Sequence, residues 1–230
     1  MALTDDAREK IKAMIRSGEL VPGGKLPAEA QLADRLGLSR NSLREAVKAL
    51  EAMRVLEVRR GDGTYVTNLE PSEALESMSF VLDLQDDDSL IEMLVVRRAL
   101  EGLAASMATE RATEKDIAHL RMLVESSSET PDIEELVRRD LEFHRAIAQL
   151  ADNRYLTGLL DNLAGGTFRA RTWRGLTESD AVERTLREHS AIVDAIELGD
   201  TSLVTAQMGV HVAGVERWIR GARHPSAIHP

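Results

Sequence analysis

Three histidines and one aspartate of this sequence lie on apolar helical stripes, where polar side chains are uncommon. His144, His189 and His211 recur with apolar residues at helical spacing, so their side chains should point into the interior of a helical domain. Asp140 stands four residues before His144, and residues four apart share a helix face. A buried carboxylate needs a cation or several donors, and three converging imidazoles cannot all be charged in an apolar interior. The combination predicts a divalent metal site formed by these four residues.

The metal ion would be one that accepts nitrogen and oxygen ligands. The chain contains no cysteine, so thiolate ligands, disulfides and cysteine nucleophiles are excluded. One carboxylate with three neutral imidazoles suits a borderline ion, and ligand type alone does not choose among such ions. We expect zinc, with nickel or another first-row metal as the alternative. The other histidines lie on a mixed helix face (His119) or near the end of the chain (His224 and His229).

A metal-dependent hydrolase is one function that such a site would allow. Catalytic zinc keeps an open coordination position and usually has a base nearby. Glu142, Glu188 and Asp194 are the carboxylates in reach by sequence, but Glu142 and Glu188 adjoin ligand positions and should therefore face away from the metal. We accordingly expect neither enzyme activity nor catalytic residues.

Residues 89–221 are predicted to form the elements that hold these ligands. They show helical periodicity without a convincing strand, interrupted by turn signals at residues 86–89, 112–113, 126–131, 152–153, 176–180 and 199–200. This pattern predicts an antiparallel bundle of six or seven helices. Residues 70–88 are predicted to be a linker with a first connecting helix, and residues 222–230 a flexible tail.

Residues 1–69 have a different pattern. Helices are expected at Ala7–Ser17, Ala28–Leu36 and Arg40–Met53, and only a tight turn separates the last two. Two alternating stretches, Val55–Val58 and Thr64–Thr67, flank a glycine-rich tip and predict a hairpin. The chain is therefore predicted to be mainly α, with an N-terminal winged helix-turn-helix before the bundle. The expected core positions of its helix-turn-helix are Leu32, Leu36, Leu43, Val47 and Leu50.

The charge distribution supports this division. The net charge is −10, but residues 1–69 hold 12 Lys and Arg against 10 Asp and Glu, whereas residues 70–230 hold 17 against 29. A basic head on an acidic body is typical of a DNA reader joined to a domain that does not bind DNA. The sequence shows neither a signal peptide nor an apolar run of membrane-spanning length. We therefore expect a cytoplasmic protein without a membrane partner.

The second helix of the pair carries the residue types that read DNA. Arg40 and Arg44 are one turn apart near its start, so both guanidinium groups can enter the major groove and bond to guanine. Ser39, Asn41 and Ser42 could add phosphate or base contacts.

The run from Leu26 to Leu50, followed by Gly61-Asp-Gly-Thr-Tyr-Val66, resembles the winged helix-turn-helix of the GntR family. The resemblance implies that Arg60, Gly61 and Gly63 at the wing tip approach the minor groove. A homodimer would read a palindromic operator, because a two-fold dimer reads two half-sites. Two positions depart from the family. Ala30 replaces a frequent DNA-contacting arginine, which implies an altered operator preference, and Arg54 replaces a frequent glycine before the wing.

Three segments of the predicted bundle, Asp140–Ala148, Glu188–Ile196 and Met208–His211, resemble the ligand-binding domain of the FadR subgroup, the metal-containing FCD type. The resemblance extends from about Ser89 to Arg220, and the family's Asp and three His ligands correspond to the four residues named above. It implies a small organic acid as effector, held by the metal and by an arginine that pairs with its carboxylate. The candidate effector-binding residue is Arg97. Three more arginines are either further contacts or surface ion pairs, namely Arg169, Arg171 and Arg174.

The expected function is that of a repressor that leaves its operator when it binds a small carboxylate metabolite. An effector can act in this way only if it has different affinities for two arrangements of the dimer. The alternative is a regulator whose metal is structural or is itself the signal. In that case chelation would alter DNA affinity and no organic acid would.

Overall fold

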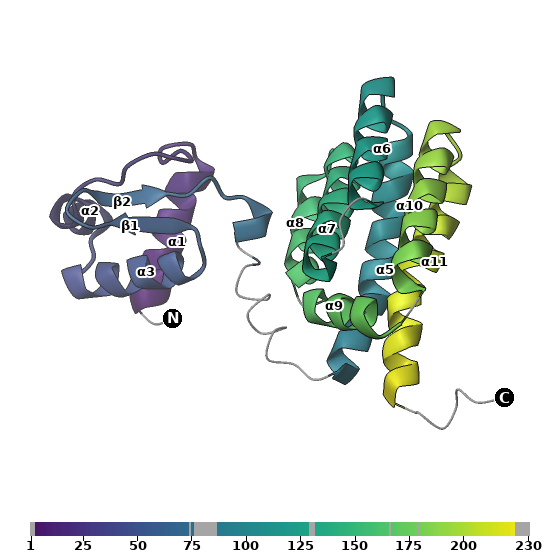
Figure 1. The fold of residues 1–230 in the computed structure, drawn as a ribbon. Helices are drawn as coiled ribbons and strands as arrows, with labels where there is room; N and C mark the ends of the chain where they lie inside the picture. The colour runs from purple at the N-terminus through teal and green to yellow at the C-terminus, as the bar shows by residue number, and fades with distance from the viewer. Residues whose placement is uncertain are drawn as a thin grey trace. The chain divides into compact units, whose positions relative to one another are not determined.

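The computed structural model describes residues 3–73, 75, 87–128, 132–165, 167–178 and 180–223. The chain divides into two compact units, Met1–Ala74 and Leu75–Pro230, which are described separately below (Figure 1). Most of the expected linker with its connecting helix at 70–88, and residues 224–230 of the expected tail, lie outside the described residues.

The N-terminal unit is a winged helix-turn-helix, as the sequence predicts. It consists of α1 (Leu3–Arg16), α2 (Glu29–Leu36), α3 (Arg40–Ala52), β1 (Leu56–Arg59) and β2 (Gly63–Val66). The two strands are antiparallel and pair from Leu56 with Val66 to Arg59 with Gly63, which forms a small wing. Helix α1 packs against α3. Each strand lies one residue away from its expected position, and α1 begins four residues earlier than expected.

Local residue choices fix the turn between α2 and α3. Gly37 has a φ of 66°, a left-handed conformation that glycine adopts without steric cost. The hydroxyl of Ser39 then caps α3 by accepting a hydrogen bond from the Ser42 N–H at 3.0 Å. Of the predicted core, Leu32, Leu43 and Leu50 are buried, whereas Leu36 and Val47 are partly buried against the same cluster.

The end of α3 contains a less common backbone conformation. Arg54 has a φ of 56° although it is not glycine. Its N–H donates to the Glu51 carbonyl at 2.9 Å, and its carbonyl accepts from the Thr67 hydroxyl at 2.7 Å. The left-handed residue therefore connects the end of α3 with the end of the wing.

The C-terminal unit is helical throughout its described part. From residue 87 onward, the described residues form the helices α5 (Asp87–Thr109), α6 (Glu114–Ser128), α7 (Ile133–Leu150), α8 (Arg154–Gly165), α9 (Phe168–Thr177), α10 (Ala181–Glu197) and α11 (Thr201–Arg223). Five of the predicted turns, at 112–113, 126–131, 152–153, 176–180 and 199–200, fall at or overlap breaks between helices. The turn predicted at 86–89 is wrong, because Asp87, Asp88 and Ser89 form the first turn of α5, and the break between α8 and α9 has no counterpart in the prediction. Helix α9 lies across one end of its neighbours in Figure 1. No helix within the described ranges combines the length and apolar character that crossing a bilayer requires.

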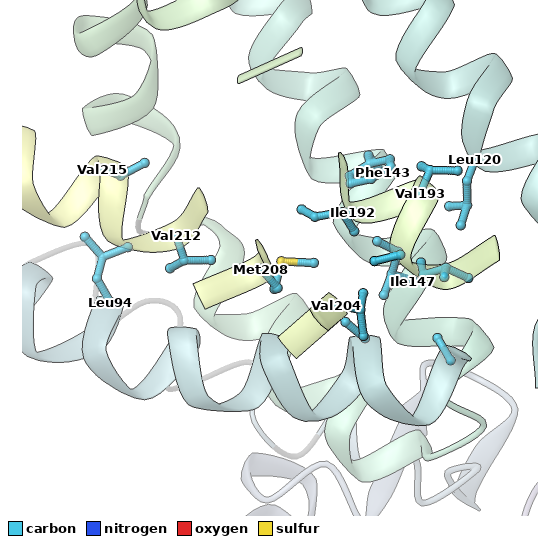
Figure 2. Close-up of a cluster of buried hydrophobic side chains, with 14 of the residues drawn as sticks. Leu94, Leu120, Phe143, Ile147, Ile192, Val193, Val204, Met208, Val212 and Val215 are labelled. Atoms are coloured by element: carbon cyan, nitrogen blue, oxygen red, sulfur yellow. The ribbon is translucent and has the colours of Figure 1, made fainter. Parts of the chain in front are cut away.

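One face of helix α11 is buried in this unit, and the helix packs most extensively against α5. Figure 2 shows Val204, Met208, Val212 and Val215 of α11 in one buried cluster with side chains of α5, α6, α7 and α10. Positions 204, 208 and 212 recur every four residues and form a single stripe on the helix. Because this stripe faces the interior, His211 is carried inward between Met208 and Val212.

Candidate metal centre and nucleic-acid interface

Asp140, His144, His189 and His211 meet in the interior of the C-terminal unit, each of them buried. One ligand atom from each residue lies within 4.8 Å of the others. The His144 and His189 Nε2 atoms lie 3.1 and 3.3 Å from the His211 Nε2. The Asp140 Oδ1 lies 3.7, 3.2 and 3.8 Å from the Nε2 atoms of His144, His189 and His211, respectively.

These separations fit a divalent ion at the centre of the four atoms. Zinc binds imidazole nitrogen and carboxylate oxygen at about 2.0–2.2 Å, which places tetrahedral ligands about 3.4 Å from one another. The five measured separations span 3.1–3.8 Å. The donor set of one carboxylate and three imidazoles is also one that borderline metal ions accept. The sequence-predicted ligand set is therefore assembled in a metal-compatible arrangement.

Three helices carry these ligands. Helix α7 supplies Asp140 and His144 from consecutive turns, α10 supplies His189, and α11 supplies His211. The Phe143 ring stacks on the His189 ring with centroids 4.1 Å apart and an interplanar angle of 21°, which limits the orientations of that imidazole. The core residue Phe143 and the ligand His144 are thus neighbours on α7.

Two glutamates support the ligands, a role that is not among the sequence-based expectations. Glu101 Oε2 lies 2.5 Å from the His144 Nδ1, and Glu188 Oε2 lies 2.9 Å from the His211 Nδ1. Such carboxylates fix the tautomer and raise the basicity of a ligating imidazole. The expectation that Glu188 faces away from the site is wrong, because its long side chain reaches from α10 to the ring on α11. Glu142 is exposed, as expected.

Arg97 bonds to Glu101, the glutamate that supports His144. Its guanidinium donates to Glu101 Oε1 at 2.7 Å and to the Thr167 hydroxyl at 2.7 Å, and its side chain is 1% exposed. Burial by itself raises the pKa of Glu101, but His144 and Arg97 outweigh burial and hold that pKa well below its usual range. Glu101 is therefore ionised beside its two cationic or hydrogen-bonding partners. Direct contact between Arg97 and an effector stays a prediction.

A cavity of about 60 Å³ adjoins the ligand cluster and is lined by Asp140, His189 and His211. Arg171 and Arg174 of α9 also line it, and both are buried. Arg171 forms an ion pair with the Asp140 Oδ2, and Arg174 Nε donates to Glu178 Oε2 at 2.7 Å. These two arginines are buried rather than part of the surface. The side chain of Arg169 lies outside the described residues.

Several N–H groups of these arginines have no acceptor. Nε and Nη2 of Arg171 and Nη2 of Arg174 are buried without a hydrogen-bond partner among the described residues. Burial, and then the charge of Arg97, lower the pKa of Arg171 well below its ordinary value. Buried cationic donors of this kind require an acceptor, so this wall of the cavity is suited to an anion.

The structure places the sequence-predicted DNA-reading residues on the surface of the N-terminal unit. Arg40, Asn41 and Arg44 are exposed on α3, and the Arg44 Nε lies 2.7 Å from Glu29 Oε1, in an exposed ion pair. Ser39 and Ser42 occupy the cap of α3, with their hydroxyl oxygens 2.8 Å apart.

At the wing tip, Arg60 and Gly61 are exposed and Gly63 is half-buried. Gly61 has a φ of 77°, which favours glycine. Gly63 has a φ of 152°, which also favours glycine, whereas a Cβ there would meet only the movable end of the Lys25 side chain.

Acidification is expected to destabilise the metal-free protein. Burial lowers the pKa values of His189 and His211 well below the ordinary value of 6.5. Below about pH 6.5 the unfolded chain therefore binds more protons than the folded chain, so stability falls as pH decreases toward the folded-state pKa values. Thermal melts of metal-free protein at pH 7.5 and pH 5 would measure this effect. An equal pH dependence in a His189→Ala variant would contradict the assignment to these rings.

Removal of the Glu188 side chain should weaken metal binding without unfolding the protein. Loss of an outer partner of a ligating histidine typically costs about 10–100-fold in metal affinity. We expect this loss for Glu188→Ala in a competition titration against a chromophoric chelator, and a smaller loss for Glu188→Gln. The exposed Glu142→Ala variant serves as the matched control. Equal metal affinities of the Glu188→Ala and Glu142→Ala proteins would show that Glu188 does not position His211 for metal binding.

Comparison with known proteins matches both units. A family model described as "FCD domain" matches residues 92–214, and one described as "Bacterial regulatory proteins, gntR family" matches residues 3–66. A "Putative L-lactate dehydrogenase operon regulatory protein" of Escherichia coli K12 is 32% identical over 235 residues, covering 99% of this chain and 90% of its own. A "Galactonate operon transcriptional repressor" of the same organism is 35% identical over 190 residues, covering 80% and 82%.

A solved structure of similar fold is that of the Streptococcus agalactiae GntR. It superposes with a TM-score of 0.71 at 25% sequence identity, covering 94% of this chain and 99% of its own. The matched family models thus correspond to the two units seen here, one with the wing and one with the ligand cluster.

Proposed function

Because the chain belongs to the GntR family of bacterial transcription regulators and carries an FCD domain, we propose that it is a repressor that a small organic acid releases from DNA. The acid would bind beside a divalent metal ion held by Asp140, His144, His189 and His211. The family is one of transcription regulators and not of enzymes, so the hydrolase alternative is no longer needed.

The observation that carries the proposal is the pairing of buried arginines with the ligand cluster. Arg171 and Arg174 line the same cavity as Asp140, His189 and His211, and they bring N–H groups that lack an acceptor. A carboxylate would supply acceptors to these groups and could complete the coordination of a bound ion. Such charge-assisted bonds are stronger than neutral ones. We expect zinc in this site, with nickel or another first-row metal as the alternative.

The names of two relatives agree with an acid effector. One is named for an L-lactate dehydrogenase operon and the other for a galactonate operon, and both lactate and galactonate are small organic acids. We expect Arg97 to support the site indirectly, because it bonds to Glu101 and Thr167 and holds both in place. These bonds use Nε and Nη1 of Arg97, so a direct bond to the effector would come from its remaining N–H groups.

DNA recognition would use the exposed residues of α3 and the wing. Arg40 and Arg44 would read base edges in the major groove, and the tip with Arg60 would approach the minor groove. Ser39, Asn41 and Ser42 would contact phosphates or bases, and the tip glycines would allow a close approach of the wing.

We propose a homodimer that binds a palindromic operator. Helices α5 and α11, which pack side by side, carry exposed apolar residues suited to a second copy, namely Val95, Val96, Leu103, Leu203 and Val210.

Two measurements test the proposal together. Thermal shift of the metal-loaded protein against sugar acids, hydroxyacids, dicarboxylates and fatty acids should give a hit, because a ligand at 100 times its Kd adds about 2.7 kcal/mol of stability. The hit should disappear in Asp140→Ala and persist in the exposed His119→Ala. Fluorescence anisotropy with DNA from upstream of the gene should then show weaker binding in the presence of that acid. If no acid acts but chelation changes DNA affinity, the metal-responsive alternative replaces this proposal.

A further inference from the structure

Lys25 lies in the connector between α1 and α2, yet its backbone is paired with the wing. The Gly23 N–H donates to the Val66 carbonyl, and the Val66 N–H donates to the Gly24 carbonyl, both at 2.9 Å. Lys25 itself stands opposite Tyr65 of β2 in an antiparallel bridge. The connector therefore runs alongside β2, and backbone hydrogen bonds fix the position of Lys25 beside the wing.

The side chain of Lys25 extends toward the tip of the wing. It crosses the backbone of Gly63, where a Cβ would lie 2.6 Å from the Lys25 Cε. Its Nζ donates to Asp62 Oδ1 at 2.7 Å, and the Tyr65 hydroxyl donates to Asp62 Oδ2 at 2.7 Å. Lys25 and Asp62 are 37 positions apart in the sequence, but the fold places the ammonium group of one beside the carboxylate of the other at the tip.

Asp62 brings a negative charge to a tip that we expect to approach DNA. Hydrogen bonds from Lys25, and then from Tyr65, lower the pKa of Asp62, so the carboxylate is ionised at neutral pH. An unpaired carboxylate at this place would be repelled by the phosphates of DNA. The ammonium of Lys25 compensates this charge, whereas no ion pair of Arg60 occurs within the part of the chain that the structure describes.

The width of the minor groove determines what the ammonium can reach. The groove is about 6 Å wide, and a phosphate backbone borders it on each side. A wing tip that enters the groove therefore brings groups at its sides close to phosphate oxygens. Lysine has three N–H donors, and the bond to Asp62 uses one of them. Since the Lys25 side chain is 49% exposed, its other donors are accessible to a phosphate.

We propose that Lys25 is a further DNA-contacting residue, whose ammonium bridges Asp62 and a phosphate at the edge of the minor groove. Asp62 is a positioning residue, because it holds the ammonium at the wing tip. This inference rests on the proposed function only in that the wing approaches DNA, and it is independent of the effector. It accounts for a carboxylate at a tip that must come close to phosphates.

The salt dependence of DNA binding tests the inference. Each neutralised phosphate contributes about 0.9 to the slope of log K against log salt concentration. Lys25→Gln should therefore lower the slope by about 0.9, so that the loss of affinity between about 50 and 200 mM salt is roughly 3.5-fold smaller than in the parent protein. Fluorescence anisotropy of the full chain with a duplex from upstream of the gene measures both quantities.

Asp62→Asn separates a phosphate contact from stabilisation of the wing. It removes a negative charge near the phosphates and frees the ammonium, so DNA affinity and the salt slope should not fall. The double variant Lys25→Gln/Asp62→Asn should bind DNA more tightly than Lys25→Gln, because it leaves no unpaired carboxylate at the tip. Thermal melts of all three proteins should stay close to that of the parent, since an exposed ion pair contributes little to stability.

Two further variants serve as references. Lys115→Gln removes an exposed lysine of α6 in the C-terminal unit, makes the same change in net charge and should keep the parent slope. Arg60→Gln removes the exposed arginine of the tip and tests the proposed approach of the wing to DNA by itself. Its slope should also fall.

The possible results separate the two ideas. If Arg60→Gln lowers the slope and Lys25→Gln does not, the wing approaches DNA as proposed and the inference about Lys25 is overturned. If neither variant changes the slope, the proposed approach of the wing is wrong and the inference fails with it. If Asp62→Asn weakens DNA binding as much as Lys25→Gln does, the pair only holds the wing together, which likewise overturns the inference.

Discussion

Alanine in place of His189 is expected to abolish stoichiometric metal binding. The imidazole contributes one of four converging ligand atoms, with its Nε2 3.2 Å from Asp140 Oδ1 and 3.3 Å from the His211 Nε2. Loss of a direct ligand should exceed the roughly 10–100-fold loss that follows removal of an outer partner. An ion at 1,000 times its Kd adds about 4.1 kcal/mol, and each kcal/mol corresponds to about 2–4 °C in a domain of this size. The melting temperature of the metal-loaded protein should therefore fall by about 10 °C.

Elemental analysis of the purified protein and thermal melts with and without chelator measure both effects. His119→Ala is the control, because that histidine is exposed on α6. Comparison of the two metal-free proteins separates the loss of the ion from the small cavity left in the core. Normal metal stoichiometry in the His189 variant would exclude this residue as a ligand.

Arg44→Ala should cost about 1–3 kcal/mol of operator binding if its guanidinium bonds bidentately to a guanine. Arg44 is exposed on α3 one turn after Arg40, and in the absence of DNA it pairs with Glu29 at 2.7 Å. This exposed pair is worth little, so DNA can displace it at low cost. Binding to the operator and to a half-site mutant, measured at several salt concentrations, should show reduced discrimination as well as reduced affinity.

Arg111→Ala removes an exposed arginine of the C-terminal unit and controls for the change in net charge. If the Arg44 variant discriminates between the two DNA sites as well as the parent protein does, Arg44 contacts only phosphate. A Glu29→Gln variant adds an internal comparison. It frees Arg44 from its partner and should leave discrimination intact.

The metal ligands could be predicted from the sequence because helical periodicity identifies inward-facing positions. Asp140, His144, His189 and His211 each belong to an apolar stripe, and polar residues there need a shared reason to be buried. The winged helix-turn-helix was predictable for a similar reason, since its turns depend on local residues such as Gly37 and Ser39. Most helix breaks follow from Pro, Gly, Asp and Ser signals, whereas the end of α8 at Gly165 is not among the predicted breaks.

The surroundings of the ligands could not be predicted in the same way. Arg171 and Arg174 belong to α9, whose composition is typical of a surface helix. Their burial depends on how α9 packs across the end of the other helices. Helical periodicity places Glu188 on a face that points away from the ligands. Its side chain is nevertheless long enough to reach the His211 ring. Glu101 is partly predictable, because it stands four residues after Arg97 in a mainly apolar segment and can pair with it on one helix face.

The left-handed backbone at Arg54 affects which residues position 54 can accept. An L-residue in this conformation costs about 1–2 kcal/mol, whereas glycine costs about 0.4–1 kcal/mol more chain entropy on folding. The net cost of the L-residue is therefore about 0–1.6 kcal/mol, and the backbone bonds to Glu51 and Thr67 need no particular side chain. An exchange between glycine and a long cation at position 54 thus leaves the backbone link between α3 and the wing intact.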